Sequence, residues 1–255
     1  MNRSEMPAQE RNVVLSVRDV KISYRVVKPV SIGTLLRGEQ SRDDRRFEAV
    51  RGVSFEVYDG EIVGIVGKNG SGKSTLLRAV ANIYSPDTGT ICTYGHSVSL
   101  MSVGVGFSNE LSGRDNVYLS GMLMGFSKKQ IDEKIDDIIA FADIGEFIEA
   151  PVRSYSSGMH SKLAFSITAI METDIMLVDE TLSVGDSRFR KKSSKKMRQL
   201  IRDEKKTVLL VSHSDSVLRE LCTRLIWLDE GKIRMIGGTK AVLEAYENDS
   251  NFEVE

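Results

Sequence analysis

Short runs of aliphatic and β-branched residues recur along the chain and predict a series of buried strands. They occupy residues 13–17, 53–57, 62–66, 175–179, 207–211 and 224–228. Runs of this length with polar or glycine-rich flanks are typical of strands in a packed core. Residues 229–232 have the composition of a turn and lead into a further short strand at 233–236.

A different periodicity governs the stretch from Asp115 to about Ala142. Its apolar residues recur at helical spacing and fall on one face: Ile131, Ile135, Ile138, Ile139 and Ala142. Ser127 and Gln130 have the spacing of a capping box, which marks the start of a helix. We therefore predict a helical segment inserted between strands.

The order of elements around residues 62–75 indicates the fold class. An apolar run enters a glycine cluster and is followed by a helical segment that begins near Lys73. Strand, glycine loop and helix in this order predict a parallel α/β architecture. Residues 28–47 contain Pro29, Gly33, Gly38 and a dense run of charges, and we predict a loop there. A short helix is expected near residues 240–247.

The glycine cluster, GKNGSGKST at residues 67–75, matches the pattern of a phosphate-binding loop. Gly67, Gly70 and Gly72 let backbone N–H groups surround a β-phosphate, and the start of the following helix adds partial positive charge. Lys73 would neutralise β- and γ-phosphate oxygens. The predicted nucleotide-binding residues of the loop are Gly67, Asn69, Gly70, Ser71, Gly72, Lys73, Ser74 and Thr75.

Two acidic residues, Asp179 and Glu180, end the apolar run IMLV. Ligands bind at the carboxyl ends of strands in such sheets. Asp179 and the Ser74 hydroxyl would hold Mg²⁺, and Glu180 would orient and polarise the water that attacks the γ-phosphate. An acidic pair at a strand end is on its own more often a surface turn, and the phosphate loop is what favours a catalytic interpretation.

The charge balance and the cysteine content limit the classes of binding partner and the cellular compartment. The 35 Lys and Arg residues nearly cancel the 36 Asp and Glu residues, so the net basic field of a non-specific nucleic-acid binder is absent. Cys92 and Cys222 lack metal-ligand spacing and suit a reducing compartment. Residues 1–12 are a polar leader without an apolar segment, and no run is long enough to span a bilayer. We expect a cytosolic protein that reaches a membrane only through a partner.

A second motif selects among the many enzymes with a phosphate loop. YSSGM, at residues 155–159, opens an apolar-periodic helix and resembles the signature motif of ABC ATPases, whose usual form is LSGGQ. Ser156 and Gly158 agree with that form, whereas Tyr155, Ser157 and Met159 depart from it. The resemblance implies that the signature of one copy covers the ATP bound by another, so a homodimer with ATP and Mg²⁺ as cofactors is expected.

Other landmarks of this family occur in order over nearly the whole chain. Tyr24 stands where an aromatic ring stacks on adenine, although a core tyrosine is the alternative, and His213 stands where the family has its γ-phosphate sensor. Residues 183–186, SVGD, resemble the D-loop, which crosses the dimer interface. Val103 occupies the place of the Q-loop glutamine, which leaves the usual contacts of that loop without their side chain.

The resemblance implies a single domain over residues 13–250 with the α/β fold of an ABC-type P-loop ATPase. Its expected parts are a mixed sheet core, an antiparallel β subdomain and an inserted helical subdomain at about residues 113–170. In that subdomain, four residues are expected to line a groove for a membrane subunit or to belong to the core: Met122, Leu123, Met124 and Phe126. Residues 188–198 form a basic helix that suits either anionic lipid headgroups or solvent.

Several segments resemble the ATPases of polysaccharide exporters, and those of teichoic-acid exporters more closely. They are GFSNELSGRDN, YSSGM, SVGD and CTRLIWLDEGK, with a long insert before Val53. The resemblance implies a separate membrane permease in two copies and a lipid-linked polymer as cargo, contacted mainly through the permease. It places the chain at the cytoplasmic face of the membrane. The chain ends soon after residue 247, so no C-terminal carbohydrate-binding domain is expected.

Three alternatives stay open at this point. One is an exporter ATPase for another glycolipid, such as O-antigen or capsule. The second is a soluble ABC ATPase of translation or DNA repair, although the former usually carries two ATPase halves and the latter a long coiled coil. The third is a nucleotide-gated module without turnover, against which the intact Lys73, Asp179, Glu180 and His213 argue.

Overall fold

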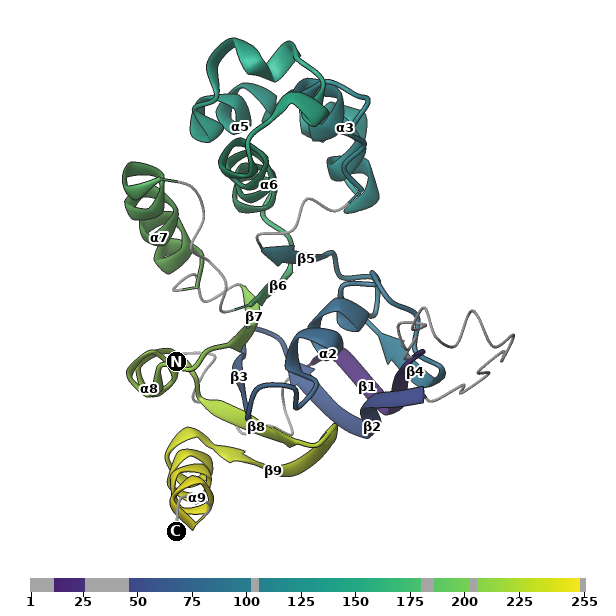
Figure 1. Ribbon diagram of the computed structural model, residues 1–255, viewed down its shortest axis with the longest axis vertical. Coiled ribbons are helices and arrows are strands. Elements are labelled where there is room, and N and C mark those ends of the chain that lie inside the picture. The colour runs from purple at the N-terminus through teal and green to yellow at the C-terminus, as the bar shows by residue number, and fades with distance from the viewer. Residues whose placement is uncertain (1–11, 26–45, 102–105, 180–185, 202–205, 253–255) are drawn as a thin grey trace, which may run out of the picture.

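The computed structural model describes residues 12–25, 46–101, 106–179, 186–201 and 206–252 (Figure 1). Several expectations lie outside these ranges: Glu180, Val103, residues 183–185, the leader and most of the 28–47 insert. Their placement stays a prediction.

Two sheets form the centre of the molecule. The first is antiparallel, in the order β2-β1-β4, and consists of β1 (Val13–Arg25), β2 (Arg46–Tyr58) and β4 (Thr88–Cys92). The second has the order β5-β6-β7-β3-β8-β9 and consists of β3 (Ile62–Val66), β5 (Val98–Met101), β6 (Ile175–Val178), β7 (Thr207–Val211), β8 (Arg224–Asp229) and β9 (Lys232–Gly238). All its pairs are parallel except β8 with β9, so the sheet is mixed, as expected.

The central strands are apolar because both faces of the larger sheet are covered. Every residue of β6 and of β7 is buried. A strand that is covered on both faces has a continuous apolar run and not an alternating pattern. Because β3, β6 and β7 run parallel, the segments that follow them emerge at the same edge of the sheet. This edge carries the phosphate loop, Asp179 and His213.

Helices cover the two faces of the larger sheet differently. One face packs against α2 (Lys73–Val80) and the antiparallel sheet, in a core that includes Leu76, Val50 and Ile226. The other face packs against α6 (Ser157–Met171), α7 (Ser187–Ile201), α8 (Asp215–Leu221) and α9 (Thr239–Phe252). The helical part and α9 form opposite ends of the molecule (Figure 1).

The inserted helical part has a core of its own. It comprises α3 (Gly113–Leu123), α4 (Lys128–Asp132), α5 (Ile135–Ala142), two 3₁₀ helices (Gly145–Glu149 and Val152–Ser154) and one face of α6. The capping box between Ser127 and Gln130 is confirmed. The opposite face of α6 reaches the sheet core, because Leu163 and Ile167 belong to one cluster and Phe165 and Ala169 to the other.

The structure corrects several predicted boundaries. The helical stretch expected at 115–142 consists of three helices, because the chain leaves helical geometry at residues 124–127 and again at 133–134. β1 and β2 are longer than predicted because they pair along their whole length, and this pairing places Arg46 and Phe47 in a strand and not in the predicted loop. β4, β5 and α8 were not predicted, and α9 is longer than predicted. In the described ranges, no helix combines the length and apolar content that crossing a bilayer requires.

Candidate nucleotide-binding site

The phosphate loop depends on two glycines at which a side chain has no space. Gly67 has φ +148° and Gly72 has φ +100°, a region that L side chains rarely adopt. A Cβ added to Gly67 would lie 2.0 Å from the carbonyl oxygen of Leu228, and one added to Gly72 would lie 2.3 Å from that of Ala49. The loop is therefore held between β8 and β2, and only glycine fits at these two positions.

The helix that follows the loop begins without a capping side chain. Gly72 is the N-cap of α2, and as a glycine it has no side chain that could accept a hydrogen bond from the first turn. The first N–H groups of an α-helix have no partner inside the helix. Together with the partial positive charge of the helix start, these donors fit a bound phosphate group.

Lys73 lies at the centre of the loop and is buried. Its Nζ donates to the carbonyl oxygens of Gly67 at 2.6 Å and Lys68 at 2.8 Å. Burial lowers the pKa of Lys73, and the nearby negative charge of Asp179 partly opposes that change. Phosphate oxygens would stabilise the charged ammonium group further, so the loop has electrostatic capacity for an anion.

A cavity of about 320 Å³ brings most of the predicted residues together. Nine residues that the sequence analysis assigned to the site line this cavity: Tyr24, Asn69, Gly70, Gly72, Lys73, Ser74, Thr75, Asp179 and His213. They come from β1, the loop, α2 and the segments after β6 and β7, which are far apart in the sequence. The Tyr24 hydroxyl donates a hydrogen bond to Thr75 Oγ1 at 3.1 Å, which joins the aromatic ring to the phosphate helix.

Three further residues line the cavity and were not predicted. They are Phe47, Ala49 and Val211. Phe47 is 49% exposed and is the register partner of Tyr24 in the antiparallel sheet, so two aromatic rings stand at neighbouring positions beside the cavity. The signal in the sequence was that Phe47 follows the charged run SRDDRR as a single large apolar residue.

Ser71 and Gly67 support the loop from inside and do not line the cavity. Ser71 is buried, and its Oγ is a buried polar atom without a hydrogen-bond partner in the described part of the chain. Its carbonyl oxygen accepts a hydrogen bond from Gly231 N at 3.1 Å. The structure thus places Ser71 between the loop and the turn after β8.

The donor set at this edge fits Mg²⁺ only together with a nucleotide. A hydroxyl from Ser74 and a carboxylate from Asp179 are oxygen ligands, which Mg²⁺ prefers. No group of three or more His, Cys, Asp or Glu residues in the described ranges could hold a metal by itself. A magnesium ion here would need phosphate oxygens as additional ligands.

Both cysteines are free thiols, and burial raises the pKa of Cys222 to about 12.

The signature residues lie away from this cavity. Ser156 is the N-cap of α6, and its Oγ accepts a hydrogen bond from Met159 N at 3.2 Å. Gly158 lies in the first turn, and a Cβ there would lie 3.8 Å from the Ser156 hydroxyl. Neither residue lines the cavity that contains Lys73. The structure therefore separates these two predicted parts of the site within one copy.

An ion pair joins the signature helix to α7. Lys162 on α6 lies 2.7 Å from Asp186, the described residue of the predicted D-loop. Asp186 also accepts hydrogen bonds from the backbone N–H groups of Arg188 and Phe189 at the start of α7. The Lys162 hydrogen bond and these backbone bonds lower the pKa of Asp186 to about 2.

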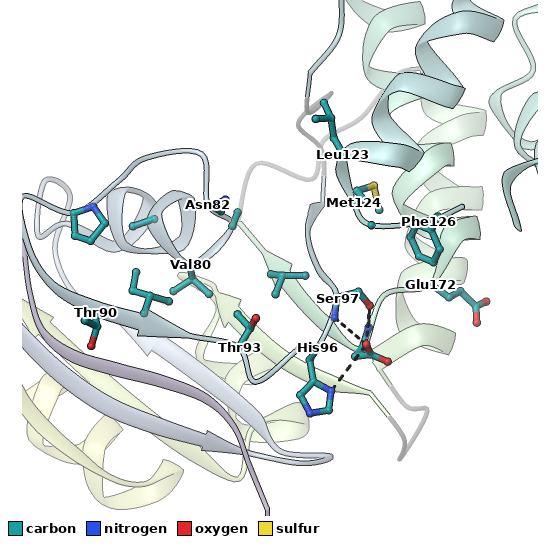
Figure 2. Close-up of a pocket in the computed structure, with 18 of the residues that line it drawn as sticks. Val80, Asn82, Thr90, Thr93, His96, Ser97, Leu123, Met124, Phe126 and Glu172 are labelled. Carbon is teal, nitrogen blue, oxygen red and sulfur yellow. Dashed lines mark hydrogen bonds and ion pairs between the residues drawn. The ribbon is translucent and has the colours of Figure 1, made fainter. Parts of the chain in front are cut away.

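A larger cavity of about 810 Å³ forms a groove between the helical part and the two sheets. Figure 2 shows Val80 and Thr90 on one side and Leu123, Met124 and Phe126 on the other. Met122, which was expected in this groove, does not line it. Met124 lines the groove and also belongs to the buried core of the helical part, whereas Leu123 is 58% exposed.

Polar residues lie at the base of the groove. Asp174 accepts hydrogen bonds from Ser97 N at 2.9 Å and Ser97 Oγ at 2.7 Å, and His96 Nδ1 lies 4.0 Å away (Figure 2). Partial burial opposes ionisation of Asp174, but the Ser97 hydrogen bonds outweigh it and lower the pKa. The base therefore combines a fixed carboxylate with apolar walls.

Residues 50–183 match the ABC transporter family. The chain is 45% identical over 212 residues to the teichoic acids export ATP-binding protein TagH of Lactococcus lactis, covering 83% of this chain and 45% of that protein. It is 42% identical over 213 residues to the O-antigen export system ATP-binding protein RfbB of Klebsiella pneumoniae, covering 82% and 85%. The chain spans about half the length of the TagH protein and of a Myxococcus xanthus RfbB protein.

Solved structures show the same fold. One is the dimeric ATP-binding cassette MJ0796 bound to ADP and Pi, with a TM-score of 0.63 at 20% identity, covering 88% of this chain and 98% of that one. Another, the ATP-binding subunit of an ABC transporter, has a TM-score of 0.67 at 18% identity, covering 92% and 93%. The chain belongs to the ABC transporter family.

Proposed function

We propose that this chain is the ATP-hydrolysing subunit of an ABC exporter for a lipid-linked cell-envelope polymer. The observation that carries the proposal is the cavity that gathers Lys73, Asp179 and His213 at one sheet edge. The relatives at 38–45% identity named for export of teichoic acids or O-antigen support the transport role.

The residues of the cavity account for the chemistry of hydrolysis. Backbone N–H groups of the loop and the Lys73 ammonium hold the phosphates of ATP, and His213 contacts the γ-phosphate. Ser74 and Asp179 would hold Mg²⁺, which supplies charge stabilisation to the phosphate oxygens. Glu180, assigned from the sequence, polarises the water whose oxygen attacks the γ-phosphorus as the bond to the bridging oxygen breaks.

A second copy of the chain would complete this site. The signature residues Ser156 and Gly158 stand at the start of a helix, where N–H donors and partial positive charge suit a phosphate. They do not line the cavity of their own copy, so they are free to cover the ATP of another. The dimeric form of the MJ0796 cassette supports this homodimer.

The groove between the helical part and the sheets would bind a separate permease. Leu123 and Phe126 supply apolar side chains, and Asp174 supplies a fixed acceptor for a helix or loop of the partner. In this arrangement the chain is peripheral at the cytoplasmic face of the membrane and contacts the polymer mainly through the permease. The cargo is a teichoic acid or a related envelope polysaccharide, the two classes that the names of the relatives contain.

A direct test purifies the chain with its co-expressed permease. MgATP hydrolysis should be lost in Lys73→Ala and retained in the control Lys129→Ala, which removes an exposed lysine on α4. Glu180→Gln should bind ATP and accumulate as a dimer without turnover. Mass spectrometry should find a lipid-linked polymer with the complex. Hydrolysis by Glu180→Gln at the parent rate, or only phospholipid in the complex, would count against the proposal.

A further inference from the structure

The helix α7 is strongly basic, and its charged side chains do not line the nucleotide cavity. Its sequence, SRFRKKSSKKMRQLI, contains seven basic residues and no acidic one. One side is buried against the sheet core and consists of Phe189, Ser193, Met197, Leu200 and Ile201. The whole outward side is therefore cationic or neutral polar, in a chain whose total charge is nearly balanced.

Two of these cations have structural roles. Lys192 Nζ donates to the carbonyl oxygen of Phe141 at 3.0 Å, close to the end of α5. Lys196 pairs with Glu172 at 3.0 Å. These contacts hold α7 against the helical part and need no further partner.

Four other cations of α7 form an exposed basic face. We define this basic face as Arg190, Lys191, Lys195 and Arg198, which line one shallow hollow with Ser187, Ser194 and Gln199. All four are exposed, and none makes an ion pair with another residue in the described ranges. Lys191 lies four residues before Lys195 and Arg198 three residues after it, so like charges are neighbours on the helix surface.

This arrangement lowers the stability of the isolated helix. Neighbouring like charges at these spacings repel each other. Arg190 and Lys191 also lie in the first turns of α7, where the helix dipole favours negative charge. An ordinary solvated face mixes both signs, as α4 does when Lys128 pairs with Asp132. A bound anionic surface would relieve both kinds of repulsion.

We infer that the basic face of α7 binds the anionic lipid headgroups of the membrane on which the exporter stands. The inference rests on the proposed function, because the permease is what brings the chain to the bilayer. The position of α7 supports it: Lys196 on α7 pairs with Glu172, and Glu172 lines the groove assigned to the permease. This ion pair places α7 beside the element that would contact the permease.

The chemistry of the basic face suits phosphate headgroups more than a polynucleotide. Its lining consists only of Arg, Lys, Ser and Gln residues, with no aromatic ring on which a base could stack. The first and last of its four cations are eight residues apart, which is roughly 12 Å along the helix axis. A compact cluster of flexible cations matches laterally mobile anionic lipids, which can gather beneath it.

Flotation of the full chain with vesicles tests the inference. Phosphatidylcholine vesicles that contain about one third phosphatidylglycerol should bind the protein, vesicles of phosphatidylcholine alone should not, and raised salt should release it. Lys191→Ala with Lys195→Ala should lower the partition coefficient on the order of thirtyfold, because each lysine near the surface contributes ~1 kcal/mol. The control, Lys129→Ala with Lys232→Ala, removes two exposed lysines elsewhere and should retain binding.

Three outcomes would overturn the inference: no binding to phosphatidylglycerol vesicles, equal loss in the control, or tighter binding to duplex DNA at matched phosphate concentration. The proposed function is read separately, from MgATP hydrolysis and permease co-purification of the same variants. Neither Lys191 nor Lys195 lines the nucleotide cavity or the groove, so both readouts should stay at parent values. Lost hydrolysis with retained lipid binding would instead count against the proposed function.

Discussion

The nucleotide cavity is shaped by backbone contacts, whereas the groove is shaped by side chains. At the cavity, the backbone of the loop lies against the backbone of β2, since a Cβ on Gly72 would lie 2.3 Å from the Ala49 carbonyl oxygen. At the groove, side chains face solvent: Leu123 is 58% exposed, and a Cβ on Gly125 would have no other described residue within 4 Å. The first shape is fixed within one chain and suits a small ligand. The second leaves apolar surface for a partner to cover, which suits a protein.

The largest effect should come from adding one methyl group to each region. Gly72→Ala forces the loop away from Ala49, and displacing phosphate donors by about 1 Å should lower MgATP hydrolysis on the order of 100-fold. Gly125→Ala meets open space, so it should cost only about 1–2 kcal/mol of unfolding free energy, from its positive φ, and leave hydrolysis unchanged. Steady-state kinetics measures the rate of MgATP hydrolysis, and thermal unfolding measures the stability of each variant. Equal losses of hydrolysis would show that the cavity is no more constrained than the groove.

The groove should respond next, through partner binding. Leu123→Asp places a charge in the apolar wall and should weaken permease co-purification at least about tenfold, since burial of one leucine contributes ~1.5–3 kcal/mol. ATP binding by the isolated chain should not change.

Met122→Asp is a matched control for this experiment. Met122 is the neighbouring residue on α3 and is 53% exposed, but it does not line the groove. It should therefore retain permease binding. If both variants lose the permease equally, the binding surface is the helix as a whole and not the groove.

The same contrast explains what the sequence could predict. Asp179 and His213 could be expected at one edge because they follow apolar strands, and parallel strands bring their carboxyl ends together there; both line the cavity. Phe47 was missed because its strand begins only through pairing with β1, which is a tertiary effect. Met122 and Leu123 are adjacent apolar residues of the same predicted helix, so periodicity could not tell which one faces the groove. The positions of site residues that follow from backbone geometry can be predicted from a sequence, whereas the exposure of a surface side chain depends on packing.

The aromatic wall should give a smaller effect than the loop. Tyr24→Ala removes a ring that would stack on adenine and should lower ATP affinity about tenfold, in line with ~1–3 kcal/mol per stacked base. Tyr24→Phe keeps the ring and loses only the hydrogen bond to Thr75, so about threefold is expected. Calorimetric titration of ATP distinguishes them. If Tyr24→Phe loses as much as Tyr24→Ala, the hydroxyl and not the ring would be the important group.

The smallest effect concerns the joint between the signature helix α6 and the start of α7, where Lys162 pairs with Asp186. The pKa of Asp186 is lowered to about 2 in the folded chain, below its ordinary value near 3.9. A lowered carboxyl pKa stabilises the fold above the unfolded pKa, and this stabilisation is lost as pH falls from about 4 towards 2. Asp186→Asn should therefore be slightly less stable than the parent at pH 6, and the difference should shrink as pH falls towards 2 and below. Denaturant unfolding across this pH range measures the difference in stability. Asp132→Asn is the comparison, because its carboxylate pairs with Lys128 inside the helical part.

If only Asp186→Asn also slows MgATP hydrolysis at neutral pH, the joint transmits the position of the signature helix to the nucleotide edge. Unchanged hydrolysis in both would make it a purely structural link.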